Sequence, residues 1–304
     1  MVTHNAPPAV LESAVGALLE TLSTPELESI PISVHMIDNG GSARARLEAA
    51  DVELAPADGA RVTLTEIENR GFAHAVNTGC SAATSAGASV VVCLNDDVIT
   101  RPGWLLPLLD SLDARSDLGA VQPLLVSVMP GGAETVNSAG VVLDGSGAAS
   151  DIGRGEDAEH WSGRSTGSVA AVTGGAMAIR AECWESVGGL DERFFLYYED
   201  VEWCRRASAD GWEFAVVFES VVEHLGSATT EGLGDRRAEL LERNRLWCTA
   251  MTGDGGTLLR GLWLSVRRLR HTPRAAHARG LLAGIAGIPS RLVRRWNLLP
   301  AAKS

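Results

Sequence analysis

The stretch that decides the fold is S-V-V-V-C-L-N-D-D-V at residues 89–98. Its apolar run over residues 90–94 is too short for a buried helix and rich in β-branched side chains, so it predicts a strand covered on both faces. Asn95, Asp96 and Asp97 follow where that strand ends. Ligands of open α/β sheets bind at the carboxyl ends of the strands, and carboxylate oxygens there suit Mg²⁺ or Mn²⁺. The alternative is that the two aspartates form a turn before the next helix.

Strands and helices alternate on both sides of this stretch. Upstream, apolar periodicity predicts a strand at residues 1–5, a helix at 10–23, strands at 32–36 and 62–64, and a helix at 73–86. Downstream, it predicts a helix at 104–112, a strand at 120–126, and loops with edge strands over 129–166. It then predicts a strand with a glycine break at 169–180, helices at 182–187 and 199–209, a strand at 213–222 and a helix at 236–251. This order is typical of an α/β fold around a mostly parallel sheet with right-handed crossovers.

Charge is distributed unevenly along the 304 residues. The formal net charge is −12, which argues against general binding to nucleic acid. Residues 1–254 contain 16 bases and 38 acids, whereas residues 255–304 contain ten bases and no acid. An acidic body with a basic tail predicts a tail that contacts an anionic surface.

Cysteine usage and hydropathy predict a cytoplasmic protein. The five cysteines are scattered and show no metal-type spacing, as expected of buried thiols in a reducing compartment. The first residues lack the basic region and apolar core of a signal peptide, and no apolar run approaches the length of a membrane-spanning helix. We therefore expect a protein that is soluble or that lies on the inner face of the cytoplasmic membrane.

Further acidic or metal-competent side chains lie at predicted strand ends and helix starts. Asp38 ends an early strand, Glu199 and Asp200 begin a helix, and His224 follows a late strand. Each has an ordinary structural explanation. Asp38 could form a turn, the acidic pair could favour the positive end of a helix, and the histidine could be a hydrogen-bonded structural residue.

Taken in order, these motifs resemble those of the inverting glycosyltransferases of family 2, especially the bacterial rhamnosyltransferase-like branch. The resemblance covers about residues 1–250. In the first half, the matching segments are Val2-Thr3-His4-Asn5, Asp38-Asn39-Gly40, Asn69-Arg70-Gly71-Phe72 with Asn77 and Gly79, and Leu94-Asn95-Asp96-Asp97-Val98 in place of the D-x-D metal motif. In the second half, they are Gly174-Gly175 with Arg180, Gly188-Gly189-Leu190-Asp191-Glu192, Glu199-Asp200-Val201-Glu202 and His224. Each match alone is weak, whereas the ordered set is specific.

The resemblance implies a GT-A fold and a sugar that moves, with inversion, from a nucleoside diphosphate donor to a hydroxyl acceptor. It implies Asp200 as the base, whose position at a helix start should favour the ionised form. It also implies Asp97 and His224 as ligands of a divalent metal, Mg²⁺ or Mn²⁺. The implied donor contacts are Thr3, Asp38, Asn69, Gly71, Asn77, Asn95 and Asp96, and the implied acceptor loop includes Gly174, Gly175, Glu199 and Trp203. For the tryptophan, core packing is the structural alternative.

Two departures from the family pattern matter. Asn95 replaces the first aspartate of the D-x-D motif, so Asp97 should provide most of the metal coordination. Residue 1 falls inside the first predicted strand, so that sheet edge is incomplete or the start is misplaced. The expected organisation is a GT-A domain over residues 1–254, with a nucleotide half over about 1–126 and an acceptor half over about 127–254, and then a basic amphipathic helical tail over 255–304.

The activity that the resemblance implies is transfer of rhamnose from dTDP-rhamnose to a glycan or lipid-linked acceptor in cell-surface polysaccharide synthesis. The alternatives are a UDP-hexose or UDP-galactofuranose donor, and a non-catalytic relative that binds nucleotide sugar or glycan. A sugar-phosphate nucleotidyltransferase would need a Gly-rich, basic phosphate loop after the first strand, and His4-Asn5-Ala6-Pro7 does not provide one.

The tail is expected to contact an anionic membrane peripherally. Its apolar stripe is formed by Leu258, Leu259, Leu262, Trp263, Val266 and Leu269, and arginines interrupt that stripe. A second candidate helix runs over residues 279–296 and is expected to be interrupted at Pro289. The alternative is that these helices pack on the acidic body or form a dimer contact.

Overall fold

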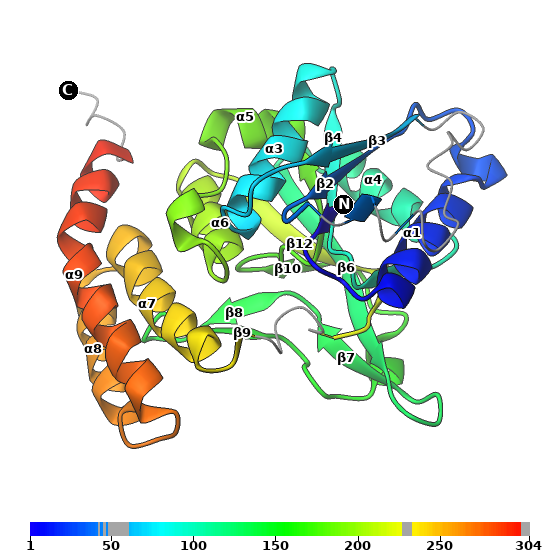
Figure 1. Cartoon of the computed structure of the whole chain (residues 1–304). Helices are drawn as coiled ribbons and strands as arrows, with labels where there is room; N and C mark the ends of the chain where they lie inside the picture. Colours follow the sequence, from blue (N-terminus) through cyan, green and yellow to red (C-terminus); the bar gives the residue numbers. More distant parts are fainter. Residues whose placement is uncertain (42, 45–46, 48–60, 227–232, 299–304) are drawn as a thin grey trace, which may run out of the picture.

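The computed structural model describes residues 1–41, 43–44, 47, 61–226 and 233–298. The chain begins with a small parallel sheet in the order β1 (Val2–Thr3), β2 (Ser33–Asp38) and β3 (Arg61–Glu66). A single parallel bridge between Val2 and Asn95 joins this sheet to β4 (Val90–Leu94). The carboxyl ends of these strands therefore meet at one edge, as the sequence predicts (Figure 1).

The larger sheet has the strand order β10-β12-β6-β11-β4, with β5 beside β12 and β7 beside β6. The bounds are β5 Val98–Thr100, β6 Leu118–Val128, β7 Glu134–Ser138, β10 Gly167–Val169, β11 Ala176–Arg180 and β12 Glu213–His224. A separate hairpin pairs β8 (Val141–Leu143) with β9 (Ala149–Asp151). The α/β class is as predicted, but this sheet is mixed rather than mostly parallel. β11 lies between β4 and β6 and runs antiparallel to both, because the chain returns across the sheet there without a crossover helix.

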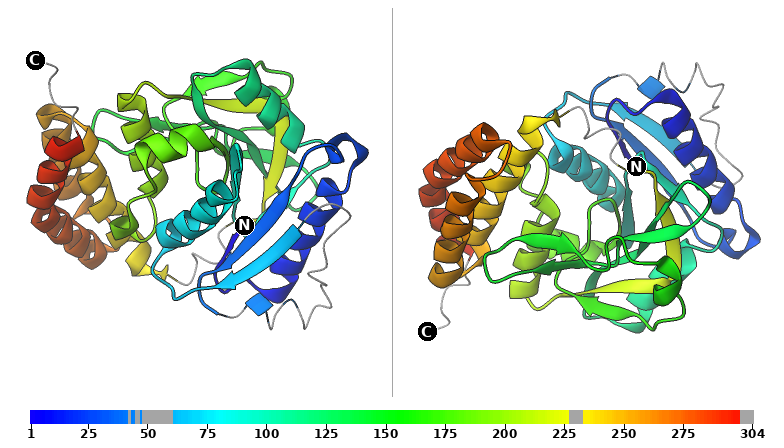
Figure 2. Two further views of the ribbon diagram at one scale, coloured as in Figure 1. Left: turned by 90° about the horizontal axis from the view of Figure 1, so that it is seen from above. Right: turned by 90° about the horizontal axis from the view of Figure 1, so that it is seen from below.

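Helices cover both faces of the sheets (Figures 1 and 2). Their bounds are α1 Pro8–Leu22, α3 Phe72–Ser85, α4 Leu105–Ala114, α5 Ala181–Val187, α6 Glu199–Ala209 and α7 Asp235–Thr252, with 3-10 turns at Pro25–Leu27, Ala158–Trp161 and Glu192–Phe194. Alternate residues of β4 belong to different core clusters. Val91 and Cys93 pack with α3, α5 and α6, whereas Leu94 packs with α1 and α4. The strand is therefore covered on both faces, as its unbroken apolar run predicts.

The chain ends in two helices, α8 (Gly255–Arg268) and α9 (Arg274–Leu298), which pack against α7 at one side of the molecule (Figure 1). The Asp254 side chain caps α8 by accepting a hydrogen bond from the Thr257 N–H. The predicted interruption at Pro289 is wrong, because α9 continues through this residue. Proline removes one backbone hydrogen bond, but packing along α7 keeps the helix continuous. Within the described part of the chain, no helix is both long and apolar enough to cross a membrane.

Candidate functional site

The ends of β1 and β4 are fastened together by Asp96. Its Oδ2 atom accepts a hydrogen bond of 2.9 Å from the His4 N–H, and the Thr3 hydroxyl also bonds to this carboxylate. Burial raises the pKa of Asp96, and the bonds from His4 and Thr3 act in the opposite direction. Thr3 and Asp96 thus lie together at the edge where the strands end, and their contact with a donor stays a prediction.

Asp97 and His224 form the part of the site where buried polar atoms lack partners. Asp97 Oδ1 lies 3.2 Å from His224 Nε2, and the Leu225 N–H donates to the Asp97 carbonyl and so aligns β12 with this strand end. Among the described residues, Asp97 Oδ1, His224 Nδ1 and the neighbouring Asn95 Oδ1 have no hydrogen-bond partner. Oxygen and imidazole nitrogen atoms are ligands that Mn²⁺ accepts.

The protein alone provides few metal ligands here. In the described ranges, no group of three or more His, Cys, Asp or Glu side chains is placed to hold a metal ion. Asp97 and His224 therefore fit a divalent metal only as a two-residue site, with Asn95 Oδ1 nearby in sequence. The remaining ligands would have to come from a bound molecule or from water.

Asp200 lies at the start of α6 and is fixed by two backbone donors. Its Oδ2 accepts a 2.8 Å hydrogen bond from the Gly174 N–H, and its Oδ1 accepts one of 2.7 Å from the Val201 N–H. Burial raises the pKa of Asp200, although these two bonds lower it in part. The predicted preference for the ionised form is therefore wrong in direction, because desolvation outweighs the helix terminus.

The Gly174-Gly175 turn connects Asp200 to the end of β4. Gly174 bonds to the Asp200 carboxylate, and the next carbonyl, that of Gly175, accepts a 2.9 Å hydrogen bond from the Asn95 N–H. A Cβ atom on Gly174 would lie 2.9 Å from a ring carbon of Phe72, so the turn has no room for a side chain. The turn thus links the candidate base to the strand end that precedes the candidate metal ligands.

Glu199, next to the candidate base, is 4% exposed, and its Oε2 has no hydrogen-bond partner among the described residues. Burial, followed by the charge of Asp200, raises the pKa of Glu199 well above its usual range. Burial raises the pKa of both adjacent carboxyls, but only Asp200 accepts two backbone N–H bonds that support its charged form.

Asp38 is fully buried, and its carboxylate forms a turn, which is the structural alternative that the sequence offered for this residue. Its Oδ1 accepts from the Gly41 N–H at 3.1 Å, and its Oδ2 accepts from the Ala43 N–H at 2.6 Å. The next residue, Asn39, donates from Nδ2 to the Gly71 carbonyl at 3.2 Å. The aspartate therefore shapes the loop after β2, and a contact with a nucleotide stays a prediction.

Asn69 and Gly71 form a tight turn against the segment that contains Phe195. The Asn69 Oδ1 accepts a 3.0 Å hydrogen bond from the Gly71 N–H. Gly71 has φ of +101°, and a Cβ there would lie 2.7 Å from the Phe195 Cα. The adjacent Phe72 N–H donates to the Phe195 carbonyl at 2.7 Å. Glycine is required here both by its positive φ and by the close approach of two backbones.

Two predicted contact residues have structural roles. Both ends of the Asn77 amide bind Leu190, since Nδ2 donates to the Leu190 carbonyl and Oδ1 accepts from the Leu190 N–H. It therefore ties α3 to the loop before α6, and its contact with the donor stays a prediction. Trp203 is fully buried and donates from Nε1 to the Gly188 carbonyl, so its predicted acceptor contact is wrong.

Asn244 on α7 is a site-supporting residue that the sequence analysis missed. It is fully buried, and its Nδ2 donates to the carbonyls of Phe194, Leu196 and Tyr197 at 2.7–3.0 Å. Three non-glycine residues in the segment leading to Asp200 have positive φ, namely Phe195, Tyr197 and Tyr198. Such a backbone persists only where its surroundings hold it, and Asn244 supplies the bonds. A single asparagine in a polar helix gives no sequence signal of this role.

Comparison with known sequences places the chain among glycosyltransferase sequences. A family model described as "Glycosyltransferase like family 2" matches residues 12–246. An N-acetylglucosaminyl-diphospho-decaprenol L-rhamnosyltransferase of Mycobacterium tuberculosis is 28% identical over 216 residues, which cover 66% of this chain and 68% of that protein. An O-antigen biosynthesis protein of Myxococcus xanthus is 29% identical over 180 residues, 55% of this chain. The match spans only 13% of the M. xanthus protein.

Solved structures share the fold. GalNAc-T7, in a crystal structure with UDP, GalNAc and Mn²⁺, superimposes with a TM-score of 0.64 and 14% identity over 97% of this chain and 56% of that one. A mannosyltransferase from Pyrobaculum calidifontis, in complex with GDP-Man and Mn²⁺, gives a TM-score of 0.53 and 15% identity over 98% and 83% of the two chains. At these identities the likeness concerns the fold alone, and it confirms the predicted GT-A fold.

Proposed function

Since the chain belongs to the glycosyltransferase-like family 2, we propose that it transfers a sugar from a nucleoside diphosphate donor to a hydroxyl acceptor, with inversion at the anomeric carbon. Rhamnose from dTDP-rhamnose is the first candidate donor, and a glycan or lipid-linked sugar is the candidate acceptor. The mycobacterial relative supports both choices, because its name describes a rhamnosyltransferase that acts on a diphospho-decaprenol acceptor. UDP-hexose and UDP-galactofuranose are the alternative donors.

The observation that supports transfer most is the placement of Asp200. Inversion requires one in-line displacement, and therefore one base beside the acceptor hydroxyl. Two backbone N–H groups fix the Asp200 carboxylate, and the Gly174-Gly175 turn connects it to the end of β4. Its raised pKa makes it a stronger proton acceptor than an ordinary aspartate once it is ionised. In the proposed reaction, Asp200 takes the hydroxyl proton as the acceptor oxygen bonds to the anomeric carbon and the diphosphate leaves.

The donor lies, in this proposal, along the carboxyl ends of β1, β2 and β4. The backbone at Thr3, Asp38 and Asn69 shapes that edge, and Asp97 with His224 would hold a divalent metal there. When bound, such a metal would neutralise charge that develops on the leaving diphosphate. The buried Asn95 Oδ1 and His224 Nδ1 have no hydrogen-bond partner among the described residues, and this supports the use, because a buried polar atom without a partner is costly unless a ligand completes it.

A panel of nucleotide sugars, incubated with the purified protein and Mn²⁺ or Mg²⁺, tests this function. We expect nucleoside diphosphate release with one donor class, and faster release when a hydroxyl acceptor is present. The competing function is that of a non-catalytic relative that binds nucleotide sugar. Binding without diphosphate release for every donor, with and without acceptor, would favour that relative.

Asn244→Asp should slow transfer without weakening donor binding. The new carboxylate lacks the N–H donors that now bond to three carbonyls, so the segment before Asp200 loses its support. We expect kcat to fall by about 10–100-fold, with the donor KM nearly unchanged, because small misplacements of a base reduce rate steeply. Ser81→Asp, which adds a carboxylate at an exposed position of α3, is the control. Equal kcat losses in the two variants would contradict this role.

We also propose that the tail contacts an anionic membrane at the cytoplasmic face. The inner sides of α8 and α9 pack on α7, as the alternative of packing on the body expects. Glu242 of α7 forms ion pairs with Arg245 of the same helix and with Arg268 of α8. Their outer sides leave large apolar side chains exposed, namely Leu259, Trp263, Val266, Leu282, Ile285, Leu292 and Val293. Arg267 stacks on the Trp263 ring at 4.7 Å. Exposed apolar side chains beside arginines suit a helix lying in a headgroup layer.

Leu259→Gln with Trp263→Gln should weaken vesicle binding. Both side chains are more than 60% exposed, so the change spares the packing on α7. We expect about a tenfold or greater loss of co-sedimentation with anionic vesicles, from the apolar area that no longer inserts. Val142→Gln, at an exposed valine of β8, is the matched control. Equal binding by the double variant, or no binding by the unaltered chain at low salt, would leave the tail a structural element.

A further inference from the structure

Two arginines that no carboxylate neutralises meet on one tryptophan between α7 and α9. Arg243 of α7 and Arg291 of α9 both stack on the Trp247 ring, with their guanidinium carbons 4.4 and 4.0 Å from its centroid. The two helices lie side by side, and α6 packs on α7 next to them (Figure 1). Within the part of the chain that the structure describes, no ion pair joins either arginine to a carboxylate.

Arg291 is the more deeply buried of the two. It is 4% exposed, and its Nε has no hydrogen-bond partner among the described residues. Burial lowers the pKa of Arg291, and the charge of Arg193 lowers it further. Asp191 acts in the opposite direction but already pairs with Arg193, and Glu202 does the same but pairs with the arginine one turn along α6. A buried guanidinium without an anion is costly, so a bound anion would stabilise this position.

Arg243 bonds only to neutral acceptors. Its Nη2 donates to the Phe194 carbonyl and its Nε to the side-chain oxygen of the next residue on α7, both at 2.8 Å. Burial lowers the pKa of Arg243 to about 10, and the charges of Arg236 and Arg291 act in the same direction. Glu239 acts against them but pairs with Arg236. Two neighbouring guanidinium groups therefore carry positive charge that the described acids leave unbalanced.

The chemistry of these groups favours a phosphate ligand that carries an apolar chain. A guanidinium group presents its N–H donors as a planar fork that matches two oxygens of one phosphate, and two such groups suit an anion with more than one charge, such as a diphosphate. Next along α9, Leu292 and Val293 are 43% and 64% exposed. An apolar surface thus adjoins the arginines, as an amphiphilic ligand requires.

The same arginines touch the segment that leads to the candidate base. Arg243 bonds to the Phe194 carbonyl, and the Phe194 ring packs edge-on against Trp247 with 6.1 Å between ring centroids. Asn244, the neighbour of Arg243, bonds to this carbonyl as well and to two more in the segment before Asp200. A phosphate bound here would therefore lie beside the segment that positions the base.

We propose that Arg243 and Arg291 form a binding site for the diphosphate of an amphiphilic ligand, whose apolar chain lies along the exposed side of α9. The proposal rests on the proposed function in one respect, namely that this ligand is the lipid-linked acceptor. The site would hold the acceptor by its phosphates, whereas the donor diphosphate binds at the strand ends.

Calorimetric titration with inorganic pyrophosphate and with farnesyl diphosphate tests the site. Both titrations are made in EDTA, which removes the divalent metal that would hold a diphosphate at Asp97 and His224. We expect saturable binding of both probes, with farnesyl diphosphate bound about tenfold or more tightly because its chain buries apolar surface. Asp97→Ala should leave both affinities unchanged. Absence of binding, or its loss in Asp97→Ala, would overturn the proposal.

Arg291→Met and Arg243→Met should each weaken binding of both probes by about tenfold or more, since a hydrogen bond to a charged group is among the stronger ones. Methionine keeps a long side chain against the Trp247 ring but lacks the charge. Arg164→Met, which removes a guanidinium lying 4.0 Å from the Trp161 ring, is the matched control and should bind like the unaltered protein. Tm checks that each variant is folded. Unchanged affinity in the folded variants would contradict the site.

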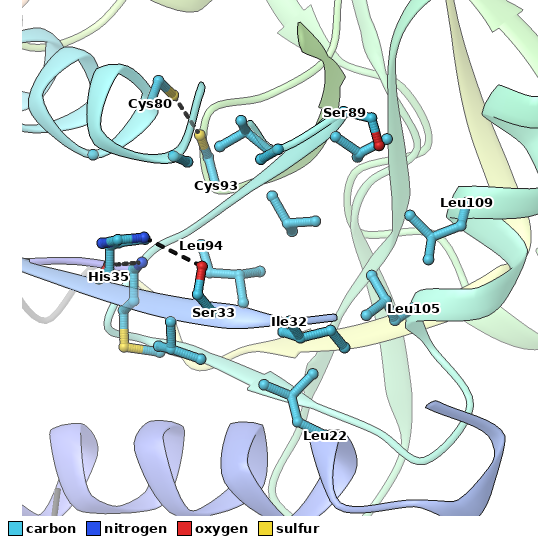
Figure 3. A pocket seen from close by; sticks show the side chains of 18 of the residues that line it. Leu22, Ile32, Ser33, His35, Cys80, Ser89, Cys93, Leu94, Leu105 and Leu109 are labelled. Atoms are coloured by element: carbon cyan, nitrogen blue, oxygen red, sulfur yellow. Dashed lines mark hydrogen bonds between the residues drawn. The ribbon is translucent and has the colours of Figure 1, made fainter. Parts of the chain in front are cut away.

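The farnesyl chain has another place to bind, the apolar cavity in Figure 3. Its volume is about 680 Å³, and leucines such as Leu22, Leu105 and Leu109 line it. Since its described lining contains no arginine or lysine, binding there should not depend on phosphate. Farnesol is therefore titrated in parallel. Equal affinity for farnesol and farnesyl diphosphate would place the probe in this cavity and overturn the proposal.

Vesicles separate a membrane headgroup from a diphosphate ligand. Co-sedimentation with phosphatidylglycerol vesicles is measured for the unaltered protein and for Arg291→Met. Loss of vesicle binding in this variant, together with no binding of either diphosphate probe to the unaltered protein, would assign the arginines to a lipid headgroup and contradict the proposal. None of these readouts needs a donor or turnover, so failure of this site is distinct from failure of the proposed sugar transfer.

Discussion

Asp200→Asn should reduce the rate of sugar transfer by about 10²–10⁴-fold while donor affinity barely changes. The amide keeps the shape of the carboxylate and can still accept from the Gly174 N–H, but it cannot take a proton from the acceptor hydroxyl. Measuring kcat and the donor KM for both proteins separates a chemical defect from a binding defect. Comparable changes in kcat and KM would argue against a role as base.

Glu199→Gln is the matched control for this variant. Glu199 is buried, its pKa is raised well above the usual range, and glutamine keeps its size and shape. We expect a mild effect on kcat. A large loss in Glu199→Gln together with a mild loss in Asp200→Asn would shift the assignment of the base by one residue.

The pH profile gives an independent check on the same residue. Burial raises the pKa of Asp200, so the ionised form that can accept a proton is lost at a higher pH than for an ordinary aspartate. The kcat of the unaltered protein should therefore fall as the pH decreases through this raised pKa. The residual activity of Asp200→Asn should lack that acid limb.

Asp97→Ala and His224→Ala should each reduce transfer by about 10²–10³-fold, the usual cost of losing stabilisation of charge in the transition state. The Asp97 Oδ1 and His224 Nε2 atoms lie 3.2 Å apart, and the neighbouring Asn95 Oδ1 has no hydrogen-bond partner among the described residues. Both variants should need more Mn²⁺ for half-maximal rate, and direct titration with Mn²⁺ and a nucleoside diphosphate should give weaker binding. Far-UV circular dichroism and Tm would check that the fold is retained.

The controls are Asp117→Ala and His160→Ala, which replace exposed residues outside the Asp97–His224 pair. Neither change should alter the Mn²⁺ dependence. Full activity of the unaltered protein in excess chelator would contradict a metal role for Asp97 and His224.

The sequence predicts the elements of this fold well because their signals are local. The apolar run at residues 90–94 specifies a strand covered on both faces, and the polar residues after it mark the edge where the strands end. Strand direction in the larger sheet was harder to predict. β11 runs antiparallel between β4 and β6, and that arrangement depends on contacts between segments far apart in the chain.

The candidate site was predictable by residue type more than by role. Motif spacing places Asn77 and Trp203 near the site, but it does not tell which way a side chain points. The Asn77 amide bonds to Leu190, and the Trp203 indole lies in the core. Asn244 on α7 supports the segment that precedes α6, and Glu199 at the start of α6 becomes buried, only once the chain has folded. Such features need the tertiary structure.

The most direct test of the account is the identification of a glycosylated product. The purified protein is incubated with dTDP-rhamnose, Mn²⁺ and a diphospho-lipid-linked N-acetylglucosamine, and with the UDP-sugar alternatives in parallel. Product mass and anomeric configuration are measured by mass spectrometry and NMR, with Asp200→Asn beside the unaltered chain. The account predicts an acceptor enlarged by one sugar of inverted configuration, formed by the unaltered protein and nearly absent with the variant. Product formed equally by both proteins, or with retained configuration, would contradict it.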